Sequence, residues 1–498
     1  MSDAPPAKKA KKDKTDRKGK KQQQQQQQDA GSKPVIGQAA LRVLENPAFA
    51  TYYKSQLQLD DAEWEVLEAS LRSPLPVTWR FSGYDENARL GRARMESALL
   101  PSLDVVPHAL PWYPDRLAWQ FDVSRAALRG KDWTGADAPG GEGRSQAVKE
   151  FHQWLLRETD LGRVQRQEAV SMVPALVLDV RPGHAVLDSC ASPGSKTQQI
   201  LELLAAPAAA GEPEGAAAAG VPQASGVRGL LVANDADIKR CHLLASRASR
   251  LNSPSLVVTN HDARLFPEML YERADAESGA AARPLRFDRV LCDVPCSGDG
   301  TLRKNPLIWK RWTAAAGNQL HSLQLQIACK GARLLKVGGR LVYSTCSLNP
   351  IENEAVVTRL LTTFGSECLE LVDIAAELPG LARRRGLSSW RVWHRGQWHE
   401  DYASVEERFP QKCPTKLESL FVPVGVDVPS LHLERCVRLA PQDQVRRAPI
   451  GVFPCAAALH PFSSVAALPL VSCTGLRRLL RRRAAQEARA RGRGRRAA

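Results

Sequence analysis

Short apolar runs alternate with amphipathic helical patterns from Arg181 onward. This alternation is typical of βαβ units, which form a parallel sheet covered by helices. The apolar runs that predict strands are residues 185–189, 229–233, 255–259, 289–292 and 340–344. Polar residues follow each run directly, and open α/β sheets bind ligands where their strands end. We therefore expect the five loops after these strands to line one crevice.

The rest of the chain divides by composition. Residues 1–34 are rich in lysine and glutamine and almost free of apolar side chains, so we expect a disordered tail there. Residues 46–165 mix aromatic, proline and charged positions and predict a small α+β domain, which precedes a larger domain over residues 166–444. Residues 205–226, rich in alanine, glycine and proline, predict a flexible insertion.

A helix start follows the strand predicted at residues 340–344. Asn349 is suited to the N-cap, Pro350 to the first helical position and Glu352 to the acidic position of a capping box. Cys346 would then lie in a short loop between a strand and a helix. A helix N-terminus beside a thiol lowers its pKa, which would make Cys346 reactive.

The charge of the chain is concentrated at its two ends. The formal net charge is +16 over 498 residues. The first 21 residues hold nine basic and three acidic residues, and residues 476–498 hold ten arginines and one glutamate. The segment between them is close to neutral, so the basic ends attract phosphates without explaining a specific activity.

Composition narrows the class of protein. Hydrophobic residues make up 43% of the chain, enough to fill a core and to exclude a wholly disordered protein. No apolar run reaches membrane-spanning length, and the odd count of 11 cysteines with a lysine-rich start suggests a reducing compartment. We expect the nucleus, including the nucleolus, with the cytoplasm as the alternative. Cys292 and Cys296 lack a second ligand pair at zinc-finger spacing, so we expect no metal site.

The first predicted loop, LDSCASPGSKT at residues 187–197, has small residues where a backbone must approach a ligand closely. It matches neither the GxGxxG of dinucleotide-binding folds nor a P-loop, so a nucleoside without a pyrophosphate suits it better. Asp235 closes the second strand, where a carboxylate commonly binds a ribose diol, and Asp262 is placed to meet the base. Either aspartate could instead be a solvated loop carboxylate or a helix cap.

The fourth predicted loop, residues 293–312, combines an acid, a cysteine, basic residues and two tryptophans. Trp309 and Trp312 could stack on bases or could belong to the core. Cys346 in the fifth loop reaches the same sheet edge as Cys296, and two cysteines at equivalent strand ends favour a functional role over a structural one. The candidate RNA contacts beside this loop are Arg303, Lys304, Lys310 and Arg311.

Five motifs in order resemble those of the Sun-domain RNA (cytosine-5) methyltransferases. They are LDSCASPGSKT (187–197), AND (233–235), NHDA (260–263), DVPCSGDGT (293–301) and YSTCSLNPIENE (343–354). The sequence segments that flank these motifs are similar to those of the eukaryotic multisite tRNA cytosine-5 methyltransferases, one branch of the family. It comprises LPWYPDRLAW (110–119), FHQWLL (151–156), RQEAVSMVPALVL (166–178) and HLERCVRLAP (432–441).

The resemblance implies an α/β, Rossmann-like S-adenosylmethionine-dependent methyltransferase fold with a smaller N-terminal α+β domain. It also implies a monomeric enzyme that methylates cytosine C5 in tRNA. Cytosine C5 is a poor nucleophile until a thiolate adds to C6. By resemblance, Cys346 is that nucleophile, Cys296 assists product release, Asp293 binds the N3/N4 edge of the base, and Lys196 binds nearby. The residues implied to hold S-adenosylmethionine are Cys190, Ala191, Ser192, Pro193, Gly194, Ser195, Lys196, Asp235, Asp262 and Asp293.

Two other readings stay open. One is an rRNA cytosine-5 methyltransferase, against which the flanking text argues but the catalytic loops do not. The other is a catalytically inactive RNA-binding protein on the same fold, although Cys346 and Asp293 are both present.

The chain departs from the family after Gln444. The family continues with a Gly-rich and aromatic final strand, whereas this chain has VRRAPIGVFPCAAALHPF and then an Arg/Ala-rich tail, residues 445–498 in all. Pro449 and Pro454 suit a sheet strand poorly. We therefore expect the methyltransferase sheet to lack one strand.

Overall fold

A computed structural model describes residues 45–83, 85–130, 145–206, 229–272, 283–410, 415–441, 467–468 and 470–473. The described residues belong to one compact unit, Glu45–Ala498. The predicted tail at 1–34 lies outside them, as do residues 207–226 of the predicted insertion and most of residues 445–498.

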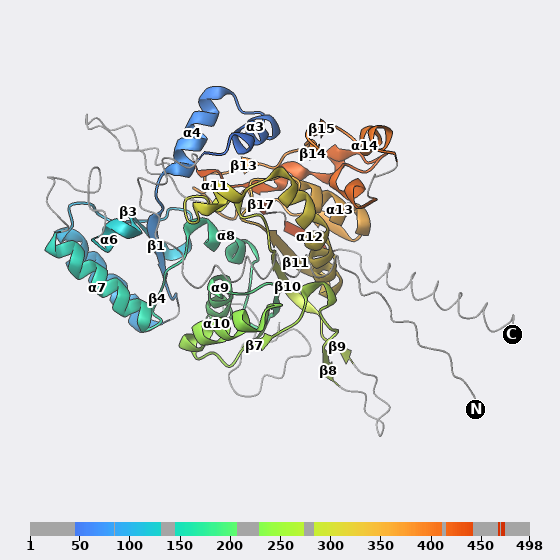
Figure 1. Ribbon diagram of the computed structural model, residues 1–498. Helices are drawn as coiled ribbons and strands as arrows, with labels where there is room; N and C mark the ends of the chain where they lie inside the picture. Colours follow the sequence, from blue (N-terminus) through green and yellow to red (C-terminus); the bar gives the residue numbers. More distant parts are fainter. Residues whose placement is uncertain are drawn as a thin grey trace, which may run out of the picture. The chain divides into compact units, whose positions relative to one another are not determined.

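A seven-stranded sheet forms the centre of this unit (Figure 1). Its strand order is β12-β18-β11-β10-β5-β6-β7. The strands are β5 (Ala185–Asp188), β6 (Leu230–Asn234), β7 (Leu256–Thr259), β10 (Phe287–Asp293), β11 (Leu335–Ser344), β12 (Leu369–Leu371) and β18 (Leu470–Cys473). The run from β11 to β7 is parallel throughout. All five predicted strands are confirmed, with ends that coincide or differ by up to five residues.

The expectation of a missing strand is wrong. Strand β18 lies between β11 and β12 and pairs antiparallel with both. Its residues, LVSC, form a short apolar run beyond the prolines that argued against a strand. An antiparallel neighbour therefore covers the edge of the parallel part of the sheet, and β11 is not an exposed edge.

Helices cover both faces of the sheet. Helices α12 (Ala314–Leu334) and α13 (Glu354–Phe364) pack on one face, where Val290 and Leu341 point toward Ile327 and Val356. The neighbouring strand residues point the other way, toward α8 (Ala169–Val177) and α9 (Ser195–Leu204). Helix α10 (Ile238–Ala248) follows β6 and packs its Leu244 against Ala233. This two-sided burial explains the continuous apolar runs in the sequence.

A second, antiparallel sheet precedes the first along the chain. Its order is β2-β3-β1-β4, and its strands are β1 (Pro76–Phe81), β2 (His108–Ala109), β3 (Ala118–Ser124) and β4 (Val164–Gln165). Helix α7 (Gln146–Asp160) packs on it, and Trp79, Phe121 and Phe151 fill a core of its own. Arg80 in β1 forms a buried ion pair with Glu202 in α9, which joins this sheet to a helix that packs on the seven-stranded sheet.

The first described helix, α3, lies against the segment that follows β10, and a second helix follows it along the chain. Helix α3 (Pro47–Gln56) is capped by Asn46, whose side-chain amide also donates to the Trp309 carbonyl at 2.9 Å. Helix α4 (Asp61–Arg72) follows it with a full capping box. The ring of Phe49 packs 5.0 Å from Trp309 in α11 (Leu307–Arg311) and 5.1 Å from Trp312. The boundary between a small N-terminal domain and a catalytic domain stays a prediction.

Shorter elements complete the described chain. They are α5 (Glu86–Arg94), α6 (Arg125–Leu128), β8 (Leu270–Glu272), β9 (Arg283–Pro284), β13 (Arg384–Arg385), β14 (Val392–His394), β15 (Gln397–His399), α14 (Tyr402–Arg408), β16 (Val437–Arg438) and β17 (Ala467–Leu468). Among the described helices, none has the length and apolarity needed to cross a bilayer.

Candidate active site

The loops that follow β5, β6, β7, β10 and β11 meet at one edge of the sheet, as expected (Figure 1). Hydrogen bonds join each loop to its neighbour. Ser192 N donates to Asp235, Asn234 Nδ2 to the His261 carbonyl, and Lys196 Nζ to Asp293. These contacts bring the predicted cofactor and catalytic positions of the central strands together.

The two candidate cysteines are in direct contact. Their Sγ atoms lie 3.2 Å apart, and the Cys346 amide donates to Cys296 Sγ at 3.3 Å. The hydrogen bond with Cys346, burial and the nearby Glu352 raise the pKa of the Cys296 thiol well above its ordinary value. Cys296 therefore keeps its proton at neutral pH, and either sulfur can be the donor in the contact between the two thiols.

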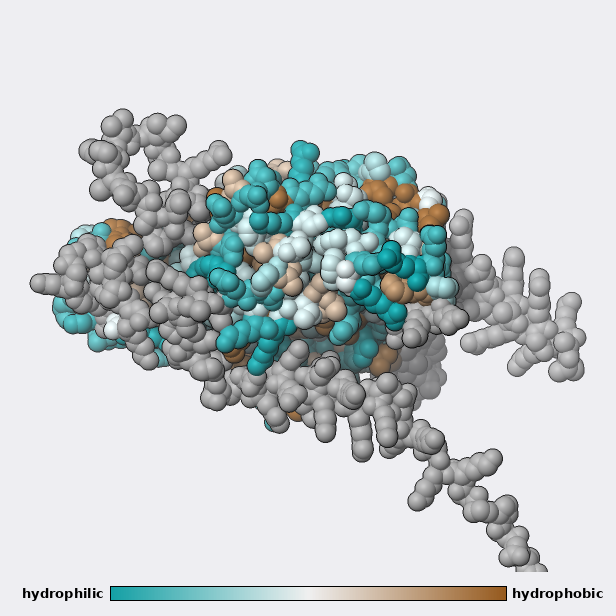
Figure 2. All heavy atoms as spheres, turned by 45° about the horizontal axis from the view of Figure 1, so that its top comes forward, coloured by the Kyte–Doolittle hydropathy of each residue, from teal (hydrophilic) through white to brown (hydrophobic). Residues whose placement is uncertain are grey.

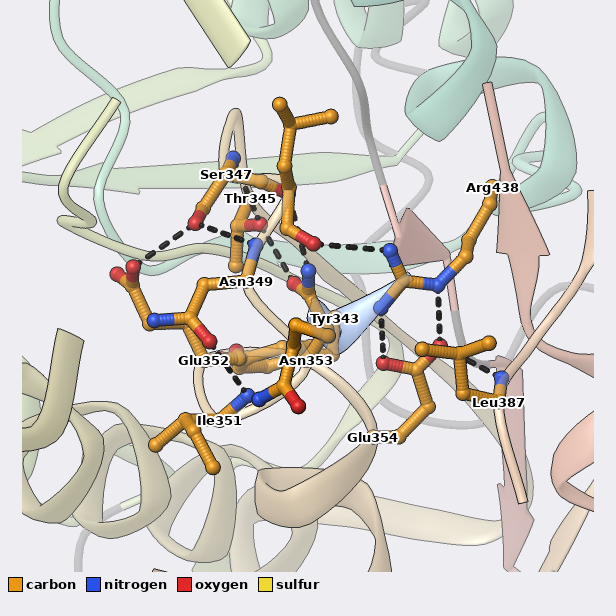
Figure 3. A network of polar contacts seen from close by, with 12 residues as sticks. Tyr343, Thr345, Ser347, Asn349, Ile351, Glu352, Asn353, Glu354, Leu387 and Arg438 are labelled. Atoms are coloured by element: carbon orange, nitrogen blue, oxygen red, sulfur yellow. Dashed lines mark hydrogen bonds and ion pairs between the residues drawn. The ribbon is translucent and has the colours of Figure 1, made fainter. Parts of the chain in front are cut away.

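The helix after Cys346 begins later than the sequence predicts. Helix α13 begins at Glu354, and its N-cap is Asn353 rather than Asn349. Asn349 instead accepts from the Ile351 amide in a tight turn, and Thr345 donates to Asn353 (Figure 3). The side chains of these residues stabilise turns, because their hydrogen-bond partners are buried groups close by in the chain around Cys346.

Asp293 and Lys196 join the β10 and β5 loops. Lys196 Nζ lies 2.8 Å from Asp293 Oδ2, and Asp293 Oδ1 accepts from Ser344 Oγ at 2.7 Å. Burial lowers the pKa of Lys196, but the Asp293 carboxylate and the nearby Cys346 more than offset this, so the pKa is raised. The site thus holds a fixed positive charge beside Cys346 and a carboxylate of fixed orientation.

Glu352 ties the two cysteine loops together. Its Oε2 accepts from the Ser297 amide at 2.8 Å and from Gln324 Nε2 at 2.9 Å. Its Oε1 accepts from Ser297 Oγ at 2.5 Å. The same oxygen accepts from Ser347 Oγ at 2.8 Å, a contact that Figure 3 shows. Ser297 follows Cys296 and Ser347 follows Cys346, so one buried carboxylate sets the spacing of both loops.

Asp299 makes the reciprocal connection. It lies in the β10 loop, is fully buried, and accepts from the Leu348 amide of the β11 loop at 2.7 Å. Tyr53 Oη from α3 and Trp312 Nε1 also donate to it. Asp299 of the β10 loop therefore binds the β11 loop, and Glu352 of the β11 loop binds the β10 loop. Helix α3 supports this arrangement through the hydrogen bond from Tyr53.

The turn after Cys346 rests on a buried ion pair. Arg438 binds both carboxylate oxygens of Glu354, at 2.6 and 2.5 Å, and donates to the Leu348 carbonyl (Figure 3). Sequence reasoning missed Asp299, Glu354 and Arg438 as site residues and assigned Glu352 to a capping box. All three lie inside the motifs quoted above, and this position could have identified them. Asp299 and Arg438 also lie within a few residues of a cysteine.

The loops on the β5 and β6 side are shaped by the backbone. Gly194 has φ +97, and a Cβ there would lie 2.8 Å from Leu244 Cδ1, so glycine is required on two counts. Asp235 is buried, accepts from the Ser192 and Asp237 amides, and lies 3.2 Å from Arg240 Nη2. Both oxygens of Asp262 bind Arg264.

Of the two roles left open for the fourth-loop tryptophans, burial favours the core over stacking on bases. Trp309 and Trp312 are only 1% and 6% exposed, because Phe49, Tyr52 and Tyr53 of α3 surround them. Arg303 is also buried and donates to two carbonyls before β1. Lys304, Lys310 and Arg311 are exposed and stay candidates for RNA contact. Within the described chain, no cluster of three or more His, Cys, Asp or Glu side chains could hold a metal ion.

Known proteins resemble this chain in sequence. A family model described as 16S rRNA methyltransferase RsmB/F matches residues 208–380. The multisite-specific tRNA:(cytosine-C(5))-methyltransferase of Saccharomyces cerevisiae is 40% identical over 411 residues, which cover 81% of this chain and 54% of that protein. The trm4b protein of Schizosaccharomyces pombe is 40% identical over 418 residues, 81% of this chain and 58% of its own length. The chain thus spans a little over half the length of these relatives.

Solved structures share the fold. A methyltransferase homolog from Pyrococcus horikoshii superposes with a TM-score of 0.51 at 19% identity, over 87% of this chain and 97% of that one. NSun6 from the same organism, solved with SFG, has a TM-score of 0.51 at 16% identity, over 86% and 99%. The fold is thus the Rossmann-like methyltransferase fold. The relatives at 40% identity carry the resemblance through most of the described chain, which is thus similar in sequence to the eukaryotic multisite tRNA (cytosine-5) methyltransferases and, over residues 208–380, to the RsmB/F methyltransferase family.

Proposed function

We propose that this protein methylates cytosine C5 in tRNA with S-adenosylmethionine, through a covalent bond between Cys346 Sγ and C6 of the base. The printed names of the relatives at 40% identity support the reaction and the substrate. The observation that carries the mechanism is the 3.2 Å contact between Cys346 and Cys296 beside the Asp293–Lys196 pair.

Cys346 acts first in this proposal. Its sulfur adds to C6, and the electron pair released into the ring makes C5 nucleophilic. Asp293 binds the N3/N4 edge and favours the protonated ring that this addition creates, while Lys196 orients Asp293. Cys296 keeps a proton 3.2 Å from Cys346. Once C5 carries the methyl group, water accepts the C5 proton, the C5–C6 double bond forms again, and the Sγ–C6 bond breaks with Cys346 leaving as a thiolate. Cys296 assists release of the product by giving its proton to this thiolate.

The β5 and β6 loops are suited to S-adenosylmethionine, which supplies an electrophilic methyl group when bound. The turn at Gly194 brings backbone close to a ligand, and the buried carboxylate of Asp235 at a strand end suits a ribose diol. The proposed contacts run from Cys190 through Lys196 and include Asp262, which would have to share its oxygens with Arg264.

The target base has to leave its stack before it can reach Cys346. Extrusion of a stacked base costs a few kcal/mol, and stacking and phosphate contacts elsewhere on the protein must offset this cost. Lys304, Lys310 and Arg311, exposed beside the β10 loop, are proposed phosphate contacts.

Transfer of tritiated methyl groups from S-adenosylmethionine to unmodified tRNA tests the proposal, with rRNA as the alternative substrate. We expect label at C5 of cytosine, no transfer by Cys346→Ala, and a protein–RNA adduct that accumulates with Cys296→Ala. Cys329→Ala, a half-buried thiol on α12, is the matched control and should behave as wild type. A folded wild-type protein that binds tRNA without transferring methyl groups would instead support an RNA-binding role.

A further inference from the structure

A large cavity lies outside the five strand-end loops. Its volume is about 880 Å³, and its walls come from α3, the first turns of α12 and the β14–β15 hairpin. The residues used below are Tyr52, Asn318, Trp393, His394, Arg395 and Trp398. The residues that line it, all in the described chain, include none of the proposed cofactor or catalytic residues. We refer to it as the hairpin pocket.

The hairpin pocket adjoins the cysteine loops. Tyr52 Oη donates to Asn349 Oδ1 at 3.0 Å, in the turn that follows Cys346. Helix α12 connects the end of β10 to the start of β11, so its first turn lies at the sheet edge that carries Cys346. A ligand in the pocket would therefore bind at the same edge of the sheet as the proposed target base.

Aromatic rings form one wall of the pocket. Trp398 stacks on Tyr52 with ring centroids 5.0 Å apart, and Trp393 meets Trp398 edge-on at 5.0 Å. Both tryptophans are partly exposed, unlike Trp309 and Trp312. Partly exposed aromatic faces are the surfaces on which unpaired bases stack, largely without regard to sequence.

Charge and polarity favour an anion with hydrogen-bonding edges. Among the described residues that line the pocket, Arg395 is the one with a formal charge, and none is acidic. Asn318 Oδ1 and His394 Nε2 are buried without a hydrogen-bond partner. Burial and the neighbouring Arg395 lower the pKa of His394, so its imidazole is neutral and can either donate to or accept from a base.

The surrounding surface argues against a protein partner. Figure 2 turns the α3 side to the front and shows its hydrophobic residues as small separate areas among hydrophilic and intermediate ones. Stable protein interfaces usually have a continuous apolar centre, which this face lacks among the residues that Figure 2 colours. A polar, anionic partner fits better.

We propose that the hairpin pocket holds an unpaired nucleotide of the RNA substrate, with its base against Trp393 and its phosphate near Arg395. The proposal rests on the proposed function and adds a second RNA contact, apart from the cytosine at Cys346. The bound nucleotide would hold the RNA in register while the target base is extruded.

Fluorescence anisotropy with labelled unmodified tRNA tests the proposal, with Arg395→Glu and Trp393→Ala as the variants. Loss of one base stack or phosphate contact should weaken RNA binding by roughly tenfold. Trp393→Phe keeps an aromatic face and should restore most of the affinity. Arg333→Glu makes the same charge change on the exposed last turn of α12, at the opposite sheet edge, and should bind as wild type.

S-adenosylmethionine affinity, measured by calorimetry on the same proteins, separates the two proposals. We expect it to be unchanged in all variants, which also shows that they are folded. RNA affinity that Arg395→Glu leaves unaltered would overturn the pocket proposal and leave the proposed function standing. A wild-type protein that binds S-adenosylmethionine but no RNA would overturn both.

Discussion

The two halves of the candidate active site are built differently. On the β5–β7 side the contacts span two to a few tens of residues, because Asp262 binds Arg264 and Asp235 accepts from Asp237 and from Ser192, 43 residues away. On the β10–β11 side they reach further, because Asp299 accepts from Tyr53, 246 residues away, and Glu354 binds Arg438, 84 residues away. The cofactor half therefore depends mainly on contacts between neighbouring loops, and the cysteine half depends on buried charges that bind distant parts of the chain.

Asp293→Ala acts where the two halves meet and should have the largest effect. The change removes the proposed base contact and leaves Lys196 without its carboxylate partner. We expect kcat for methyl transfer to fall by about 1,000-fold, in the range for a lost acid–base or orienting group. Asp293→Asn, which keeps an acceptor for Ser344, should retain more activity. A fall of less than tenfold in kcat for the alanine variant would contradict this role.

Glu352→Ala should destabilise the cysteine half. It leaves two buried N–H donors and two hydroxyls without their acceptor, and we expect a loss of about 3 kcal/mol in the free energy of unfolding. Denaturant titration measures this loss. Calorimetry should show unchanged S-adenosylmethionine affinity, because the cofactor half does not use Glu352, and weakened affinity would show that the halves are coupled.

The pH dependence of stability should identify Glu352 separately. Burial, followed by the nearby Asp299, raises the pKa of Glu352 to about 7 in the folded protein. The stability it contributes is complete below its ordinary pKa and is lost as pH rises through about 7. Wild type should therefore lose roughly 1 kcal/mol relative to Glu352→Gln between pH 6 and pH 8. Parallel stability curves for the two proteins would contradict the raised pKa.

Gly194→Ala should break the cofactor half through the backbone. A side chain at φ +97 is strained, and its Cβ would overlap Leu244. We expect a loss of about 2 kcal/mol in stability, together with weaker S-adenosylmethionine binding. Gly365→Ala is the control, because it has φ +79 and no neighbour within 4 Å. An equal loss in both variants would show that φ alone matters at residue 194.

Tyr53→Phe should have the smallest effect of the four sites. It removes one of the donors to the buried Asp299, at a cost of about 1.5 kcal/mol, because hydrogen bonds to charged groups exceed neutral ones. Tyr52→Phe removes a bond to the neutral Asn349 and should cost less in thermal unfolding. If Tyr52→Phe costs more, α3 supports the site by packing rather than through Asp299.

Patterns in short segments of the sequence explain both the correct and the incorrect predictions. The strands were predictable because a buried parallel strand is a continuous apolar run. The helix start at Asn349 was wrong because Glu352 fits a capping box locally, yet its acceptor atoms go to Ser297, 55 residues away. The role of Trp309 stayed open because its burial depends on Phe49 in a distant helix.

The sequence by itself determined the fold class, the family resemblance, the strand ends and the two cysteines, because apolar periodicity and ordered motifs are properties of short segments. Tertiary structure alone decided the 3.2 Å sulfur contact, the exchange of Asp299 and Glu352 between loops, and the seventh strand at Leu470–Cys473. The physical reason is that the partners of a buried charge or an edge strand are fixed by packing across the fold, which no local pattern encodes.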